Sequence, residues 1–517
     1  MASSYHKIND DKNNEKHIPP ENPLARPLPW WYEFYKRIVL FPWWIKYNIG
    51  VAEEAVLKDK IIELGTKMGL QDKWLKRIIR HAVSEFSKKG LGSDYYGYHN
   101  IDHELEATYF TLLAANGQQG SNKFSQNDIN HLFIAALFHD YDPLKEFDKP
   151  NEDSVEWFIR NDEKIKRFID DLGININIVL ALIHRTAYPF KGEIAEHARE
   201  RIKELLTRAG IPENDVNTRK HYEDLGWFLS VAERIAGYAL QDFQHSKDLA
   251  RRNAHALGWH PSLINEESVK YFSVFKEEKE MFERVLNGVP EEYRKRFWNN
   301  AESFKEAWLE ELGLRSSIER KEIVLVPVVE KIGSELDPHV RESVFNLYRE
   351  LPIPIRIDEE KFRRSLSDNS TILVTLRLND EYGSIVGYAK GGPLESYKLR
   401  RGTYDENMGK KNTAYLESIS IKSGYWGGTG GHILRIQFLR EAKRRGYSYV
   451  SAYVHRNVIM HRFNSGESIE IVQKYDPDRL DYYREDLTKL KEDFPLPKMD
   501  AGMLESDIVE RDFTEKN

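Results

Sequence analysis

The pattern of apolar residues changes once along the chain, near residue 320, and this change constrains the fold more than any other feature. From about residue 52 to 312, apolar side chains recur at helical spacing, as in VAEEAVLKDKIIELGTKM and HLFIAALFHD. After residue 321, short β-like runs such as STILVTLRLN and TAYLESISI alternate with helical stretches. The sequence therefore predicts an all-α part followed by a mixed α/β part.

The length of 517 residues exceeds what a single hydrophobic core supports, so we expect a multidomain chain. The expected parts are a disordered polar tail over 1–27, an aromatic arm over 28–50, an all-α domain over 51–312, a linker over 313–320, an α/β domain over 321–490 and a loose acidic tail over 491–517. The arm, LPWWYEFYKRIVLFPWWIKYNIG, is expected to pack over the domain that follows it. The alternative is that it lies flat at a membrane interface.

Composition excludes several classes of function. The net charge of −7 offers no basic field for nucleic acid, and the absence of cysteine excludes disulfides, thiolate-zinc sites and cysteine nucleophiles. The polar N-terminus lacks the apolar core of a signal peptide, and no later stretch is apolar for 18 residues, so a cytoplasmic protein is the default expectation. Any bound metal must rest on histidine and carboxylate side chains.

Ten of the 17 histidines fall between residues 99 and 260. In YHNIDH, His99 and His103 lie four positions apart, which places them on one face if the segment is helical. In ALFHDYDP, His139 and Asp140 end an apolar helical run that would bury them. Buried polar side chains need a partner, and a divalent cation is one such partner. Any one of these histidines could instead be a satisfied structural residue, but the joint pattern favours a site.

Such a group has a defined chemistry. A cation held by imidazoles and carboxylates lowers the pKa of bound water from about 15.7 toward 7 and withdraws charge from a phosphoryl oxygen. An imidazole that is not a ligand can protonate the departing oxygen, because its ordinary pKa is about 6.5. His99 suits this role, and Asp140 suits a bridge between two cations. The residue types permit Zn, Mn, Fe or, less well, Mg.

The His-Asn-x-x-His segment, followed about 36 residues later by His-Asp, resembles the HD-domain phosphohydrolase superfamily, and the Tyr-His-Asn-x-x-His form is most similar to its cyclic-nucleotide phosphodiesterase branch. The resemblance spans residues 95 to about 245. It implies that His99 is the proton donor and that the metal ligands are His103, His139, Asp140 and, where the family has an aspartate, Glu233. Asp224 is a less favoured substitute for Glu233. Thr186 matches a threonine of the family, and the neighbouring His184 is structural or functional.

A glycine cluster follows the strand-like TAYLESISI, in KSGYWGGTGGHILRIQFLREAKRRGY. A glycine turn before a helix frees backbone N–H groups that bind phosphate, although a plain flexible turn explains the glycines equally well. The order of strands, glycine turn, amphipathic helix and strand over residues 321–475 resembles the GNAT acetyltransferase superfamily. This implies that acetyl-CoA binds along the strand and the turn, at Ser418, Ile419, Ile421, Gly428, Gly430, Gly431 and Asn457.

The same resemblance implies that Glu417 is a general base, while the alternative is an outward-facing strand residue. The chain departs from the family where an arginine or glutamine normally opens the glycine motif, since Tyr425 or Trp426 stands there. No tyrosine occupies the usual general-acid position near Phe463 and Asn464, so Tyr482 or Tyr483 is expected to substitute. Cofactor binding is therefore a firmer expectation than turnover.

These observations predict a bifunctional enzyme that joins a metal-dependent phosphoester or nucleotide hydrolase to an N-acetyltransferase. Its partners would be a divalent metal ion, a small phosphoester or nucleotide, acetyl-CoA and an amine acceptor. The alternative is a regulatory protein in which one degenerate domain binds a nucleotide or acetyl-CoA and controls the other. Substrates, acceptor and oligomeric state are not encoded in these motifs.

Overall fold

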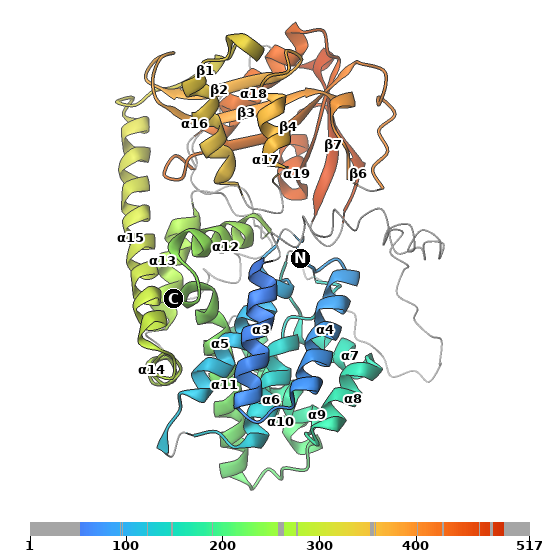
Figure 1. Cartoon of the computed structure of the whole chain (residues 1–517), viewed down its shortest axis with the longest axis vertical. Coiled ribbons are helices and arrows are strands. Elements are labelled where there is room, and N and C mark those ends of the chain that lie inside the picture. The colour runs from blue at the N-terminus through green and yellow to red at the C-terminus, as the bar shows by residue number, and fades with distance from the viewer. Residues whose placement is uncertain are drawn as a thin grey trace. The chain divides into compact units, whose positions relative to one another are not determined.

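The computed structural model describes residues 52–490 apart from residues 94, 96, 121–122, 146–147, 189, 257–262, 276–277, 352–355, 357, 401, 427–428, 465 and 476–478. The predicted tail 1–27, the aromatic arm 28–50 and the acidic tail 491–517 lie outside the described residues. The helical part and the α/β part are described separately below (Figure 1).

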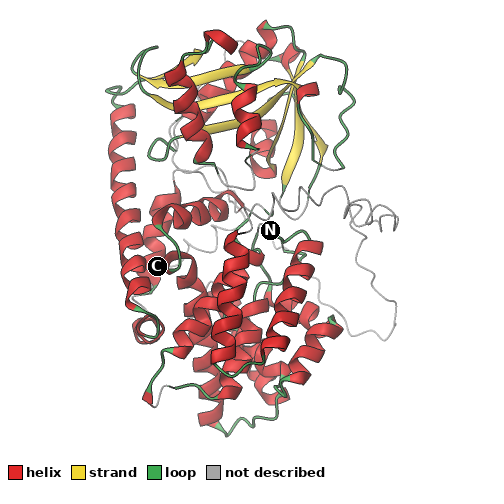
Figure 2. Cartoon of the chain, in the orientation of Figure 1, coloured by secondary structure: helices red, strands yellow, loops and turns green. Residues whose placement is uncertain are grey.

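Residues 52–319 form helices, and their described portion contains no strand, as the apolar spacing predicts for residues 52–312 (Figure 2). The helices are α3 (Ala52–Lys67), α4 (Asp72–Lys88), α5 (Ile101–Asn116), α6 (Gln126–Phe138), α7 (Glu152–Asn161), α8 (Glu163–Asp171), α9 (Ile176–His184), α10 (Gly192–Arg208), α11 (Val216–Ala239), α12 (Phe243–Ala256), α13 (Ile264–Val274), α14 (Lys279–Asn287) and α15 (Glu291–Glu319). None of the described helices combines the length and the apolar character needed to cross a bilayer.

The centre of the helical part is built around α6. Every residue of α6 from His131 to Phe138 is buried, because the run HLFIAALF is apolar on all sides after its first residue. Ser125 begins the helix with a capping box, in which its side chain accepts from the Asp128 N–H and Asp128 accepts from the Ser125 N–H. α5, α9 and α11 pack around α6, so the end of α6 lies inside the core.

The predicted linker over 313–320 is helical as far as Glu319, which corrects the sequence prediction. Gly313 lies within α15, where one glycine costs about 1 kcal/mol relative to alanine. Arg315 donates to Glu311 at 2.8 Å one turn earlier, and this ion pair supports the helix across the glycine. The chain leaves the helix only at Arg320.

The α/β part contains a seven-stranded sheet in the order β1-β2-β3-β4-β5-β7-β6. Its strands are β1 (Leu325–Val329), β2 (Ile372–Leu378), β3 (Ile385–Pro393), β4 (Thr413–Ile421), β5 (Tyr449–His455), β6 (Ile469–Gln473) and β7 (Leu480–Asp486). Its α-helices are α16 (Pro338–Arg349), α17 (Glu359–Ser365), α18 (Gly430–Arg444) and α19 (Arg456–Asn464). β4 and β5 pair in parallel, and the other neighbours are antiparallel.

Alternation along β2 places a core on each face of the sheet. Ile372, Val374 and Leu376 join the cluster that contains Leu434 and Phe438 of α18. The intervening Leu373 instead joins the cluster formed by α16 and α17. Two-residue periodicity therefore sandwiches the sheet between α18 and the α16–α17 pair.

β4 holds two of the irregularities of this sheet. Its parallel pairing with β5 covers only three residues, Thr413–Tyr415, although β4 continues to Ile421. On its other edge, β4 pairs with β3 through a bulge, because Lys390 lies opposite Ser418 while Gly391 lies opposite Leu416. Glu417 is the unpaired residue of this bulge.

Close packing at the bulge generates a first prediction. A Cβ added at Gly391 would lie 2.1 Å from the Tyr415 carbonyl oxygen, whereas at Gly392 the nearest atom is 3.5 Å away. Gly391→Ala should therefore destabilise the α/β part by roughly 1–3 kcal/mol, the usual cost of overpacking. Gly392→Ala, the matched control, should leave the unfolding midpoint nearly unchanged in thermal denaturation. Equal midpoints for the two variants would contradict the close approach of β3 to β4.

Candidate functional site

The first candidate site begins where α5 starts. Asn100 is the N-cap of α5, and its side chain accepts from the N–H groups of Asp102 and His103. His99 therefore lies before the helix, which corrects the expectation that His99 and His103 share one helical face. The two rings nevertheless meet, with their centroids 5.7 Å apart.

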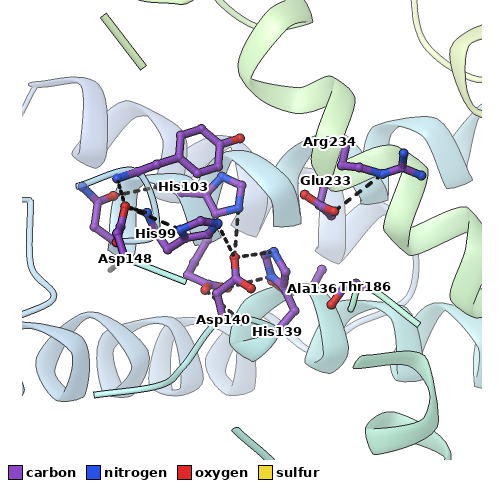
Figure 3. A network of polar contacts seen from close by, with 12 residues as sticks. His99, His103, Ala136, His139, Asp140, Asp148, Thr186, Glu233 and Arg234 are labelled. Carbon is purple, nitrogen blue, oxygen red and sulfur yellow. Dashed lines mark hydrogen bonds and ion pairs between the residues drawn. The ribbon is translucent and has the colours of Figure 1, made fainter. Parts of the chain in front are cut away.

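Three of the predicted ligands converge at the end of α6 (Figure 3). Asp140 Oδ2 lies 3.2 Å from His103 Nε2 and 3.1 Å from His139 Nε2. Both histidines are buried, and neither of these nitrogens has an aligned hydrogen bond to any described residue. Imidazole nitrogens that face one point without hydrogen bonds have the arrangement that a cation requires.

Glu233 of α11 joins this group. One ligand atom from each of His103, His139 and Glu233 lies within 4.8 Å of the others. The Glu233 carboxylate thus completes a group of ligand atoms close enough together to bind one cation. Arg234 Nε lies 3.9 Å from the Glu233 carboxylate. Asp224, the alternative ligand, instead pairs with Lys220 on the surface of α11 at 3.0 Å and does not enter the cluster.

Glu104 contacts His139 and Asp140 on the side away from the other ligands, and no sequence motif singled it out. The Asp140 N–H donates to Glu104 Oε1 at 3.1 Å, and His139 Nδ1 lies 2.9 Å from Glu104 Oε2. His139 Nδ1 donates to the Ala136 carbonyl at 3.0 Å, which fixes the ring and its tautomer, while the Glu104 carboxylate lies beside the same nitrogen. The signal in the sequence was an acidic residue within the apolar run that follows His103.

His99 is held by a second acidic residue that the sequence did not reveal, Asp148. His99 Nδ1 lies 3.6 Å from Asp148 Oδ2, and His99 Nε2 lies 3.9 Å from Asp140 Oδ2. Asp148 also accepts from the Tyr95 hydroxyl at 2.8 Å and from the Tyr98 N–H at 2.6 Å. His99 is thus placed beside the cluster without being one of its converging ligands.

Burial and mutual charge set the protonation of these groups. Burial lowers the pKa of His103 to about 4, so its ring is neutral and can accept a cation. Burial raises the pKa of Glu233 to about 8. Burial also raises that of Asp140, but the imidazoles of His139 and His99 outweigh it and hold the pKa well below its ordinary value. Asp140 is the ionised carboxylate of the cluster.

A second group of potential ligands, Asp153, Glu156 and His184, is already neutralised. Glu156 accepts from His184 Nε2 at 3.0 Å and from Arg160 and Arg201 at 2.7 and 2.6 Å. His184 is therefore a structural residue that anchors α9 to α7. Thr186 also has a local role, since its hydroxyl donates to the Ile183 carbonyl at 2.8 Å.

In the α/β part, the glycine turn is described except for Gly427 and Gly428. Gly430 begins α18 and is buried, and a Cβ there would lie 2.8 Å from Leu376 Cδ2. A Cβ on Gly431 would meet its nearest atom at 3.6 Å. Gly430 is thus required for close packing, and the side chain of Thr429, the N-cap residue of α18, makes no capping hydrogen bond to the N–H groups that open the helix. The start of α18 keeps the donors that a phosphate needs.

Glu417 is neither outward-facing nor free. Its carboxylate forms a buried ion pair with Lys390 Nζ, whose side chain also lies 4.7 Å from the centre of the Phe362 ring. Burial lowers the pKa of Lys390, and the Glu417 carboxylate opposes that shift. The alternative, an outward-facing strand residue, is therefore contradicted, and a proton acceptor at this position would first have to part from Lys390.

The other predicted cofactor residues lie on β4 and α19. Ile419 and Ile421 pack into the α18 core, whereas Ser418 Oγ donates to the Tyr388 hydroxyl at 3.3 Å on the other face. Asn457 lies in the first turn of α19, after β5. These residues therefore lie along β4 and just after β5. The pairing of these two strands ends at Tyr415 of β4.

Three of the expected substitutes for family residues, Trp426, Tyr482 and Tyr483, are engaged in hydrogen bonds. Trp426 Nε1 donates to the Ile421 carbonyl at 2.7 Å, which closes the turn rather than opening it to a ligand. Tyr482 is buried and donates to Asp405 at 2.6 Å. Tyr483 is buried and accepts from Arg462 at 2.9 Å. Neither tyrosine is poised as a general acid.

Comparison with solved structures finds matches of the two kinds that the motifs predict. The ribosomal-protein-S18-alanine N-acetyltransferase from Escherichia coli matches with 13% identity and a TM-score of 0.23, over 33% of this chain and 99% of its own. The Salmonella typhimurium protein yncA, assigned as an acetyltransferase and solved with acetyl-CoA, matches with 15% identity and a TM-score of 0.23, over 33% of this chain and 98% of its own.

The phosphodiesterase domain of the RhoPDE fusion protein from the choanoflagellate Salpingoeca rosetta matches with 13% identity and a TM-score of 0.32, over 49% of this chain and 90% of its own. No protein-family model matches the sequence, and no curated protein matches it. At these TM-scores the matches establish no activity, substrate or cofactor for this chain.

The cap of α5 generates a second prediction. Asn100→Ala removes the acceptor for two N–H groups at the start of the helix that carries His103, and should cost about 1 kcal/mol, within the usual range for an N-cap. Asn100→Ser keeps a capping oxygen and should retain most of the wild-type stability in urea denaturation followed by circular dichroism. A wild-type midpoint for Asn100→Ala would show that this cap does not stabilise α5.

Proposed function

We propose that the helical part is a metal-dependent phosphoester hydrolase. The observation that supports this most directly is the convergence of His103, His139 and Glu233 within 4.8 Å, with the ionised Asp140 between the two imidazoles. Three buried ligands and the Asp140 carboxylate, which has two oxygen atoms, suit one divalent cation or two cations bridged by Asp140. Histidine with carboxylate is compatible with Zn, Mn or Fe, and less well with Mg.

The residues around the cluster define the rest of the chemistry. When bound, a divalent cation would withdraw charge from a phosphoryl oxygen and make water more acidic. His99, placed beside Asp140 and held by Asp148, would deliver a proton to the leaving oxygen. Glu104 would keep His139 and Asp140 in their ligand orientation. The substrate is a small phosphoester or nucleotide.

Metal content tests this proposal. Purified protein should carry at least one divalent cation per chain, measured by inductively coupled plasma mass spectrometry, and should hydrolyse generic phosphoesters in a chelator-sensitive manner. His139→Ala should lose the cation and the activity, because three converging ligands become two. A hundredfold loss of affinity corresponds to about 2.7 kcal/mol.

His197→Ala is the matched control, since His197 is exposed and pairs with Asp153 outside the cluster. It should retain both metal and activity. Protein that holds no cation after supplementation with Mn, Fe and Zn, together with an inert His139→Ala substitution, would overturn the hydrolase proposal. A metal-loaded protein that hydrolyses no ester would favour a regulatory domain.

We propose further that the α/β part binds acetyl-CoA and transfers its acetyl group to an amine. The support is the uncapped start of α18 at Gly430 and Gly431, together with the separation of β4 from β5 beyond Tyr415. Diphosphate would bind the amides at the start of α18, and the extended arm would lie along β4. Glu417 would be the proton acceptor once its ion pair with Lys390 opens.

The alternative, a domain that binds acetyl-CoA without transferring it, has its own support. The Glu417–Lys390 ion pair is buried, and the two buried tyrosines of β7 are engaged elsewhere. Parting a buried pair costs more than parting an exposed one. Such a domain would serve as an acyl-CoA sensor.

Ligand binding and transfer can be measured separately. Acetyl-CoA at 100 times its Kd should stabilise the protein by about 2.7 kcal/mol, visible as a thermal shift. Glu417→Gln should keep that shift but reduce acetyl transfer to amine acceptors at least about tenfold, within the usual range for loss of a general base. Glu342→Gln, on the exposed face of α16, is the control and should change neither.

No thermal shift with millimolar acetyl-CoA would contradict the cofactor assignment. A shift without transfer in the unmodified protein would identify the sensor instead of the transferase.

A further inference from the structure

The helical part contains a cavity that the proposed hydrolase chemistry does not use. It lies where α9 ends and α10 and α11 run past it, and its volume is about 220 Å³. This exceeds the ~30 Å³ that one water occupies, but is below the 300–1,000 Å³ typical of drug-sized ligands. Its lining comprises His184, Arg185, Ala187, Phe190, Ala195, Ala198, Arg199 and Trp227.

Arg185 is the distinctive residue of this cavity. Its Nε is buried without a hydrogen-bond partner among the described residues, and its guanidinium lies 4.9 Å from the centre of the Trp227 ring. No carboxylate within the described part forms an ion pair with it. Glu223 acts on Arg185 only through its charge, without an ion pair, and a guanidinium that is stacked on one face with no bonded carboxylate is preorganised to pair with a planar or tetrahedral anion.

Arg199 adds a second positive charge at the same cavity. Its Nε donates to the Ala195 carbonyl at 3.2 Å, and its nearest acid is Glu196 at 4.0 Å, on the exposed face of α10. The cavity therefore carries two guanidinium groups and no lining carboxylate. The Arg199 side chain is 58% exposed, so Arg185 is the buried charge of this cavity and Arg199 adds positive charge from the solvent side.

The remaining walls are apolar. Phe190 and Trp227 meet edge to face with their ring centroids 5.1 Å apart, and three alanines complete the lining. His184 Nε2 is not available to a ligand in the cavity, because it is hydrogen-bonded to Glu156. A ligand that fits must combine an anionic end with a small apolar or aromatic body.

The cavity shares no lining residue with the metal cluster. The nearest link between them is Phe190, whose ring lies 4.5 Å from the Arg234 guanidinium, next to Glu233 in the sequence. A ligand in the cavity would thus occupy a separate site. It would touch Phe190, which contacts Arg234, and Arg234 follows the proposed metal ligand Glu233 in the sequence.

We propose that this cavity, between α9, α10 and α11, is a binding site for a small phosphate monoester with an apolar or aromatic ester group, recognised by Arg185 and Arg199 and packed against Phe190 and Trp227. The site is independent of the hydrolytic metal cluster.

Isothermal titration calorimetry on the full chain tests the site with phenylphosphonate, which has no ester bond to hydrolyse. Phenylphosphonate should bind at least about tenfold more tightly than inorganic phosphate, phenol or benzoate, since only it offers both a dianion and a ring. Arg185→Gln should weaken phenylphosphonate binding by about tenfold or more, the scale of one charge-assisted pair. Ala195→Leu should abolish binding by filling the cavity without altering its charge.

Two controls make the result decisive. Arg208→Gln, on the exposed end of α10 where Arg208 pairs with Glu204, should bind phenylphosphonate as the unmodified protein does. His139→Ala should also retain binding, because the cavity does not depend on the metal cluster. Loss of binding in His139→Ala, unchanged binding in both Arg185→Gln and Ala195→Leu, or equal affinity for benzoate would overturn the proposal.

Discussion

The burial of polar residues at the end of α6 is the constraint on which the helical part depends. α6 is apolar on every side after His131, so it can only lie in the centre of the bundle, and the chain reaches His139 and Asp140 before it can return to the surface. Buried polar groups are costly unless they are paired. Glu104 meets both residues, and His103 and Glu233 complete the enclosure. α5 and α11 are therefore held to α6 by the same residues that make a metal site plausible.

The α/β part depends on an analogous constraint at β4. Gly391 allows the β3 backbone to approach the Tyr415 carbonyl, and the bulge that results leaves Glu417 without an opposite residue in the β3–β4 register, although its side chain pairs with Lys390 of β3. The same strand loses its pairing with β5 after three residues. Irregularity in a central strand is costly, because it leaves ladder groups unpaired, and it is concentrated here beside the start of α18. Both proposed sites thus lie where regular packing is interrupted.

The two parts differ in how complete their chemistry is. The metal cluster has converging ligands, orienting residues and a separate histidine at the position of a proton donor. The proposed acetyl-CoA site has a helix start and an opened strand, but its candidate base is paired with Lys390 and its candidate acids are buried and engaged. The hydrolase proposal therefore rests on more independent observations than the transferase proposal. The cavity at Arg185 adds a third place where a ligand can act.

The sequence by itself determined the helical character of residues 52–312 and the mixture of strands and helices after residue 321, because each rests on a local periodicity that short-range spacing reveals. It also singled out His99, His103, His139, Asp140 and Glu233. It missed β6 and β7, and it placed a linker where α15 continues, since weak local patterns are decided by packing. Only the tertiary structure decided that Glu104 and Asp148 support the cluster, that Asp224 does not, and that Glu417 is paired with Lys390. Such contacts join residues that are close in space but distant in sequence. The spacing of residues along the chain does not encode which side chains of two elements face each other.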